Sequence, residues 1–240
     1  MRLTVAVVMF VSAVQVFAQG FPSYDAVHNS PRTVVDYFLL CPAFRLDDNG
    51  QLTFSREGGG VDPGEFDDKK NMLTSGYKAG DFTVQSAIVD IANAYIRVTG
   101  VQDDLPFTLT FVFFDRKGKS NLPAFSYYSE GGDGETYVFQ MFEIDSSREW
   151  QDVTQRVLPD FSLGVFDKSP DKPDTYPEVD WEYVLPRKGT TVLAIPHMTY
   201  KMGETGRPAD QFQLVKRLLG RSLELPWDRN NGVFKTGGVE

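Results

Sequence analysis

A strict alternation in residues 107–113, FTLTFVF, constrains the fold more than any other feature of the chain. Large apolar residues occupy every second position, and Thr or Val stands between them. Because successive side chains of a β-strand point to opposite faces, this spacing collects the large apolar side chains on one face. The segment therefore predicts a strand that covers a core with one face and ends at the turn DRKG.

Similar strand patterns recur on both sides of this segment. The stretch FTVQSAIVDIANAYIRV predicts two strands that turn near Asn93. Residues 120–128 predict an edge strand, because Pro123 cannot donate a hydrogen bond to a ladder. Further strands are expected at residues 137–143, 181–185 and 190–195, with a closing hairpin over residues 222–234.

Three segments predict short helices. Residues 31–40 follow Ser30 as a capping residue and stop before Pro42, residues 146–158 have apolar side chains at helical spacing, and residues 208–220 begin with proline and end with glycine. No strand–helix–strand rhythm is present. We therefore expect an α+β fold, in which an antiparallel β-sheet meander packs against two or three helices in a single domain.

The first eighteen residues have the pattern of a secretory signal peptide. Arg2 is followed by a short apolar run and by a small-residue exit at Val16 and Ala18. We expect residues 19–240 to form one secreted domain, with a Gly/Asp-rich loop at about residues 55–80 and a Pro-rich loop at residues 167–178. The expected location is the periplasm, or the exterior of a host that has no outer membrane.

The charge of the chain argues against several classes of partner. The formal net charge is −9, and removal of residues 1–18 takes away one arginine and makes it −10. Nucleic acids and anionic lipids are bound through Lys and Arg, so neither is an expected partner. No stretch after residue 18 approaches the ~20 apolar residues of a membrane helix, so no membrane insertion is expected.

The single cysteine, Cys41, rules out an internal disulfide bond within this chain. Val34, Phe38 and Cys41 are spaced four and three residues apart and share one face of the predicted helix. We expect the thiol to be buried as a core residue. The alternative is a thiolate nucleophile paired with His28 or His197.

The sequence predicts no cofactor and no metal site. A nucleophile elbow, an H-E-x-x-H motif and a P-loop are all absent from the sequence. Carboxylates cluster at residues 47–49 and 62–68, but their spacing does not match a calcium-binding loop. We interpret both clusters as solvated turns.

Two functions from different classes remain open. Tyr127, Tyr128, Trp181 and Tyr183 lie in predicted strands and form a candidate ligand-binding aromatic patch, which favours a non-catalytic binding or structural module of the cell envelope. The partner would be a protein or an envelope glycan. The alternative is a secreted hydrolase that uses carboxylates in the predicted strands and helix, with candidates at Asp36, Asp90, Glu143 and Glu224.

Several blocks resemble a family of uncharacterised secreted or periplasmic bacterial proteins. The blocks are TVVDYFLLCP, IVDIANAYIRVTG, WQDVTQRVLP, YVLPRKGTTV and LELPWDRNNGVF, and they span most of the chain after residue 18. Two departures are Cys41 in place of an aliphatic residue and Asn93-Ala94 in place of an Asn-Gly turn. Residues 197–219 look like an insertion. The resemblance implies location and fold but no activity and no site residues.

Overall fold

The structure is a computed structural model that describes residues 21–47, 50–55, 61–131, 134–170, 172–197, 213 and 216–240. The predicted signal peptide, residues 1–18, lies outside the described residues. Most of the predicted insertion and of the predicted helix at residues 208–220 also lies outside them.

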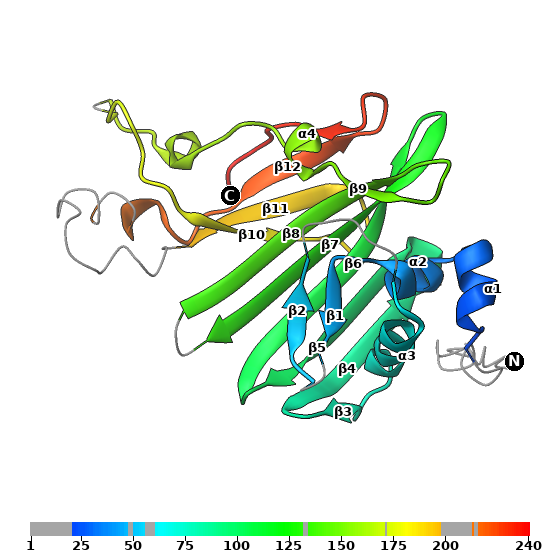
Figure 1. Ribbon diagram of the computed structural model, residues 1–240. Helices are drawn as coiled ribbons and strands as arrows, with labels where there is room; N and C mark the ends of the chain where they lie inside the picture. The colour runs from blue at the N-terminus through cyan, green and yellow to red at the C-terminus, as the bar shows by residue number, and fades with distance from the viewer. Residues whose placement is uncertain are drawn as a thin grey trace, which may run out of the picture.

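The centre of the molecule is a seven-stranded antiparallel sheet in which each strand pairs with the next strand along the chain. It curves into a half-barrel (Figure 1). Its strands are β3 (Lys78–Ala79), β4 (Phe82–Asp90), β5 (Tyr95–Gln102), β6 (Leu105–Arg116), β7 (Lys119–Gly131), β8 (Gly134–Ile144) and β9 (Trp150–Asp152). The predicted turn near Asn93 is a short 3-10 helix, Ile91–Asn93, followed by Ala94 in the left-handed region with φ 50°.

Two smaller antiparallel sheets accompany the central one. A two-stranded sheet consists of β1 (Phe44–Leu46) and β2 (Leu52–Phe54), and a four-stranded sheet consists of β10 (Asp180–Val184), β11 (Thr191–His197), β12 (Leu223–Asp228) and β13 (Val233–Phe234). Besides Ile91–Asn93, the helical elements include α1 (Tyr24–Asn29), α2 (Val34–Leu40), α3 (Pro63–Met72), α4 (Thr154–Val157) and the 3-10 helix Leu163–Phe166. Among the described residues of the predicted helix at 208–220, residues 213 and 216–218 are helical.

The central sheet is covered on both faces. On one face, Phe107, Leu109 and Phe111 of β6 pack in a core with α1, α2, α3 and the β1–β2 hairpin. On the other face, Val112 and Phe114 of the same strand pack in a second core against the four-stranded sheet. Strand β6 is therefore buried on one face near its start and on both faces near its end.

The predicted α+β fold is wrong. Strands hold 43% of the described residues and helices hold 20%, in a β-rich fold with three antiparallel sheets. The error has a physical cause in β6, where the prediction assigned one apolar face and left Val112 to solvent. Val112 is 3% exposed because the C-terminal strands form a sheet of their own and pack on it.

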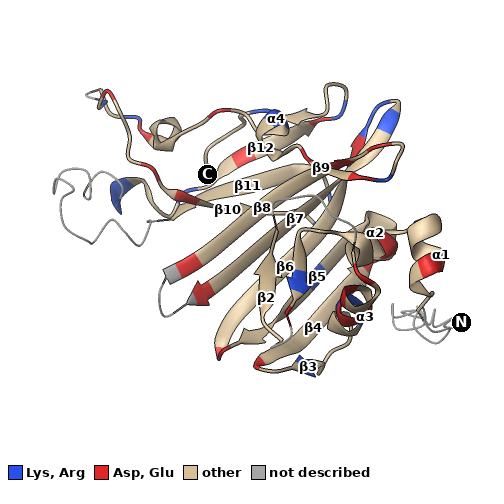
Figure 2. Cartoon of the chain, viewed as in Figure 1, with Lys and Arg blue, Asp and Glu red and all other residues tan. Residues whose placement is uncertain are grey.

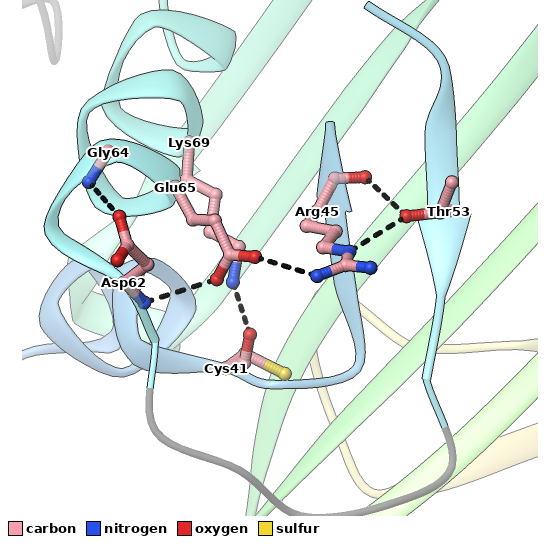
Figure 3. A network of polar contacts seen from close by, with 7 residues as sticks. All are labelled: Cys41, Arg45, Thr53, Asp62, Gly64, Glu65 and Lys69. Atoms are coloured by element: carbon pink, nitrogen blue, oxygen red, sulfur yellow. Dashed lines mark hydrogen bonds and ion pairs between the residues drawn. The ribbon is translucent and has the colours of Figure 1, made fainter. Parts of the chain in front are cut away.

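The predicted loop at about residues 55–80 is also wrong in part, because it contains α3 and β3. Asp62 accepts from the Gly64 backbone N–H, and the Glu65 carboxylate accepts from the Asp62 N–H, which caps the first turn (Figure 3). The helix buries Phe66, Lys69 and Met72. Because Lys69 takes one of the buried positions, the sequence shows no continuous apolar stripe, and the helix was not predicted.

Strand β7 is internal, although Pro123 predicted an edge. It pairs with β6 along most of its length and with β8 only from Ala124 onward. Pro123 therefore sits just outside the β8 ladder, where a missing N–H removes no hydrogen bond between those strands. An internal strand can accept a proline at the point where one neighbour diverges.

Two predicted helix boundaries also differ from the structure. The N-cap of α2 is Thr33, whose side chain accepts from the Asp36 N–H, and Ser30 lies outside the helix. Within residues 146–158, Trp150 pairs with Ile144 in a β8–β9 hairpin, and only Thr154–Val157 is helical. Short segments such as these take the conformation that their tertiary neighbours impose.

Charged residues lie mostly at strand ends, turns and helix surfaces, and the middle of the central sheet carries few of them (Figure 2). The Pro-rich segment, residues 167–178, has no regular secondary structure in its described part. Within the described ranges, no helix has the length and apolar character needed to cross a membrane.

Candidate functional site

The four aromatic residues of the predicted patch do not share one surface. Tyr127 lies on the face of β7 that packs against the N-terminal helices, is 6% exposed, and has its ring 4.5 Å from that of Phe54. Tyr128 points to the opposite face, because successive side chains of a strand alternate. The structure thus separates two neighbours that the prediction placed together.

Trp181 and Tyr183 lie half-buried in the second core. The Trp181 ring packs edge-on against Phe161 at 4.8 Å, and the Tyr183 ring stacks on Phe139 of β8 at 4.4 Å. Burial raises the pKa of Tyr183 to about 12. Tyr183 therefore joins β10 to β8 of the central sheet, whereas Trp181 packs against Phe161 and Phe166, which lie outside both sheets.

Tyr128 belongs to a polar cluster where strands β7, β8, β10 and β11 meet. Its hydroxyl donates to Glu130 at 2.6 Å, and its ring stacks on Tyr137 at 5.3 Å. The Tyr137 ring faces His197 at 4.5 Å, and His197 Nε2 lies 3.0 Å from a Glu182 carboxylate oxygen. Burial, together with the Glu130 carboxylate, raises the pKa of Tyr128. These side chains are partnered with one another.

Cys41 is a fully buried core residue, as predicted. Burial raises the pKa of its thiol to about 11, which disfavours the thiolate. Its carbonyl oxygen, and not its sulfur, accepts a hydrogen bond from the buried Lys69 ammonium (Figure 3). In the part of the chain that the structure describes, neither His28 nor His197 contacts the thiol.

The carboxylates proposed for a hydrolase have separate structural partners. Asp36 caps α2, Asp90 pairs with Arg187 at 2.9 Å, and Glu224 lies on β12. Glu143 is held between Arg116 at 2.6 Å and Arg156 at 2.5 Å. Hydrogen bonds from Asn93 and Arg187 lower the pKa of Asp90, and those from Arg156 and Arg116 lower the pKa of Glu143.

Carboxylates in the acidic clusters considered for calcium form hydrogen bonds and ion pairs with nearby residues. Asp62 and Glu65 form the cap of α3, and Asp67 pairs with Lys70 at 2.8 Å. Asp47 accepts from the Gln51 N–H, and residues 48 and 49 lie outside the described residues. Over the described ranges, no group of three or more His, Cys, Asp or Glu side chains is placed to hold a metal ion.

A cleft of about 1040 Å³ lies elsewhere, among α1, α2, the β6–β7 turn and the β8–β9 turn. Figure 1 shows both turns extending beyond the central sheet above these helices. Three half-buried aromatic residues line it, Tyr37 of α2, Phe113 of β6 and Trp150 of β9. The Tyr37 ring meets Phe113 edge-on at 5.0 Å and lies 6.3 Å from Trp150. The three rings form one continuous aromatic surface in the cleft.

Polar groups surround these rings. Hydroxyl and amide side chains line the cleft at Asn29, Ser30, Ser120, Asn121, Ser146 and Ser147. Each offers hydrogen-bond donors and acceptors. Lys119, Arg32 and Arg148 add three positive charges. An aromatic surface bordered by convergent polar groups has the general composition of a ligand-binding site.

Arg148 ties the two sides of the cleft together. Its guanidinium donates to the His28 carbonyl oxygen at 2.7 Å, which joins the β8–β9 turn to α1. The pKa of Tyr37 is raised by burial and by Asp36, whereas the nearby Arg148 charge opposes the rise. The cleft was not predicted from the sequence, because the helical spacing of residues 146–158 placed Trp150 in a helix. The isolated aromatic residue in the polar segment SSREW was the available signal.

Comparisons with known proteins give one distant structural similarity. No protein-family model matches the chain, and no curated protein matches it. The fold is similar to a solved structure described as a domain of an uncharacterized protein from Porphyromonas gingivalis W83, with 11% sequence identity and a TM-score of 0.44. The similarity covers 74% of this chain and 89% of that one. The predicted family resemblance agrees with this neighbour only in that the neighbour is also uncharacterised.

Proposed function

We propose that the protein is a secreted, non-catalytic binding module of the cell envelope and that its cleft binds a glycan. Secretion rests on the signal-peptide pattern of residues 1–18. Glycan binding rests on one observation, the aromatic surface of Tyr37, Phe113 and Trp150 within a polar cleft.

The composition of the cleft suits a sugar better than an apolar ligand. The C–H face of a sugar ring packs against an aromatic ring, and its hydroxyl groups need hydrogen-bond partners when they leave water. The cleft offers both within one concave surface. Its volume is at the upper end of the ~300–1000 Å³ usual for small-molecule pockets, which leaves room for an oligosaccharide.

The hydrolase alternative has weaker support. Catalysis by two carboxylates requires that they face each other across the scissile bond and that one has a raised pKa. Asp90 and Glu143 are held by different arginines, and the pKa of each is lowered. No observation favours this second function over binding.

The proposal is tested by titrating the protein with soluble envelope glycans, peptidoglycan fragments among them, by calorimetry. Saturable binding is expected, and Trp150→Ala should weaken it about fivefold or more, since truncation of an aromatic side chain that anchors a ligand commonly costs more than ~1 kcal/mol. Tyr37→Phe is a milder second variant that removes only the hydroxyl. Trp181→Ala is the matched control and should leave affinity unchanged. Absence of glycan binding, or equal loss in both Trp variants, would contradict the proposal.

A further inference from the structure

The cleft concentrates positive charge in a chain whose formal net charge is −9. Arg32, Lys119 and Arg148 line it, and none of the three forms an ion pair with a carboxylate in the described residues. Basic residues also mark the β6–β7 turn in Figure 2. In an acidic protein, cations that form no ion pair with a carboxylate attract anions to their site.

The two carboxylates that line the cleft, Asp145 and Glu149, offset part of this positive charge. Asp145 is committed to its own turn, where one oxygen accepts from the backbone N–H groups of Ser147 at 2.8 Å and Glu149 at 3.0 Å. Its other oxygen accepts from Gln151 at 3.4 Å. Glu149 is exposed at the turn. Three cations against two lining carboxylates leave an excess of one formal positive charge, and the hydrogen bonds of Asp145 hold its carboxylate in the turn.

Arg148 has an uncommon backbone conformation for an arginine. Its φ is 66°, in the left-handed region, at a turn closed by hydrogen bonds from the Arg148 N–H to Asp145 and from the Asp145 N–H to Glu149, both 3.1 Å. Glycine or asparagine adopts this conformation at lower cost. The turn therefore carries an arginine at a position where a glycine would stabilise the fold more, which points to a use for the guanidinium.

We propose that the cleft selects an acidic glycan, whose anionic group binds Arg148 with the support of Arg32 and Lys119 while a sugar ring packs on Trp150. This inference rests on the proposed function. A guanidinium binds carboxylate and sulfate groups through paired, charge-assisted hydrogen bonds. One N–H group of the Arg148 guanidinium donates to the His28 carbonyl, which fixes the position of the side chain. The remaining N–H groups can donate to a ligand.

The test compares three oligosaccharides of equal length by calorimetry: a carboxylated galacturonate oligomer, a sulfated dextran oligomer and a neutral glucose oligomer. At low ionic strength, at least one acidic oligomer should bind about tenfold more tightly than the neutral one, and the difference should shrink at about 0.5 M salt. A comparison of the carboxylated and the sulfated oligomer shows which anionic group the cleft prefers.

Arg148→Gly is the decisive variant, because glycine relieves the strained backbone of the turn and offsets the lost hydrogen bond to the His28 carbonyl, so a stability close to the wild type, checked by urea unfolding, is expected. It should lose the preference for acidic over neutral oligomers. Lys188→Gln, in the β10–β11 turn, removes one exposed charge elsewhere and should keep the preference. Equal affinity for neutral and acidic oligomers, with loss in Trp150→Ala, would overturn the acidic selectivity and leave the proposed function standing. Failure of all three oligomers and of envelope glycans to bind would overturn both.

Discussion

The guanidinium of Arg148 donates to the carbonyl oxygen of His28 across 2.7 Å, although 120 residues separate the two in the chain. This contact holds the β8–β9 turn against the end of α1 and defines one border of the cleft. A positive charge is thereby fixed beside the aromatic surface of Tyr37 and Trp150.

The second sheet should make Val112 intolerant of charge. Val112→Asp buries a carboxylate between the two large sheets and should destabilise the protein by more than ~3 kcal/mol. Thr108→Asp, on the same face of β6 but half-buried and outside the second core, is the control and should cost less than about 1 kcal/mol. Urea unfolding measures the free energy of unfolding of both variants. Similar decreases in the two variants would mean that the second sheet does not cover this end of β6.

Ala94 should be replaceable by glycine with a gain in stability. Its φ of 50° lies in the left-handed region, where a Cβ atom is unfavourable. We expect Ala94→Gly to stabilise the protein by about 0.5–1 kcal/mol, measured by thermal unfolding. Ala87→Gly, in the middle of β4, should destabilise it by a similar amount. A loss of stability in Ala94→Gly would count against the observed turn.

The buried Lys69 should make stability rise between pH 8 and 9. Burial lowers its pKa from 10.5 to about 8, so above pH 8 the unfolded chain holds a proton that the folded protein has released. Stability increases with pH wherever the unfolded state binds more protons. The Cys41 thiol acts in the opposite direction, mainly from pH 9 to about 11, because its pKa is raised from 9.0. The opposing cysteine contribution begins below pH 9, but from pH 8 to 9 the unfolded thiol is at most half deprotonated, so the lysine contribution is the larger of the two.

Urea unfolding at pH 8 and pH 9 should show an increase of up to about 1 kcal/mol in the wild type. Lys69→Met should abolish the increase, whatever its effect on stability itself. Lys70→Met, which removes the neighbouring lysine that pairs with Asp67, is the control and should retain it. The same pH dependence in Lys69→Met and the wild type would show that another group is responsible.

Cys41 should be unreactive in the folded protein. The side chain is fully buried and its raised pKa keeps the thiol protonated at neutral pH. A thiol reagent such as DTNB should label the protein only after unfolding, and Cys41→Ala should cost about 1 kcal/mol without changing glycan affinity. Rapid labelling of the native protein would contradict the burial of the Cys41 thiol in the core.

The sequence predicted β4 to β8 of the central sheet and the C-terminal hairpin, because the period of a strand is a local property. It missed the short edge strands β3 and β9, and it did not predict how the sheets pack. Which faces are covered is not local. Val112 and Phe114 are buried by strands that begin almost 70 residues later, and no pattern within β6 reports this.

The cleft was less predictable than the fold, for a related reason. Tyr37, Phe113 and Trp150 come from three elements that are distant in the sequence, and each is a plausible core residue in isolation. The predicted aromatic patch used residues adjacent in sequence or in neighbouring strands. Adjacent residues of a strand, such as Tyr127 and Tyr128, point to opposite faces of the sheet. Grouping aromatic residues by their closeness in sequence therefore combined side chains that lie on different surfaces.

The most direct test of the cleft is NMR observation of the indole N–H signals. The chain has three tryptophans, so three signals are expected, and single Trp→Phe variants assign them. Addition of an acidic glycan that binds the protein should shift the Trp150 signal. The signals of Trp181 and Trp227 should stay unchanged, because of the three tryptophans only Trp150 lines the cleft. A shift confined to Trp181 would place the ligand near β10 of the four-stranded sheet and would contradict the cleft as the binding site.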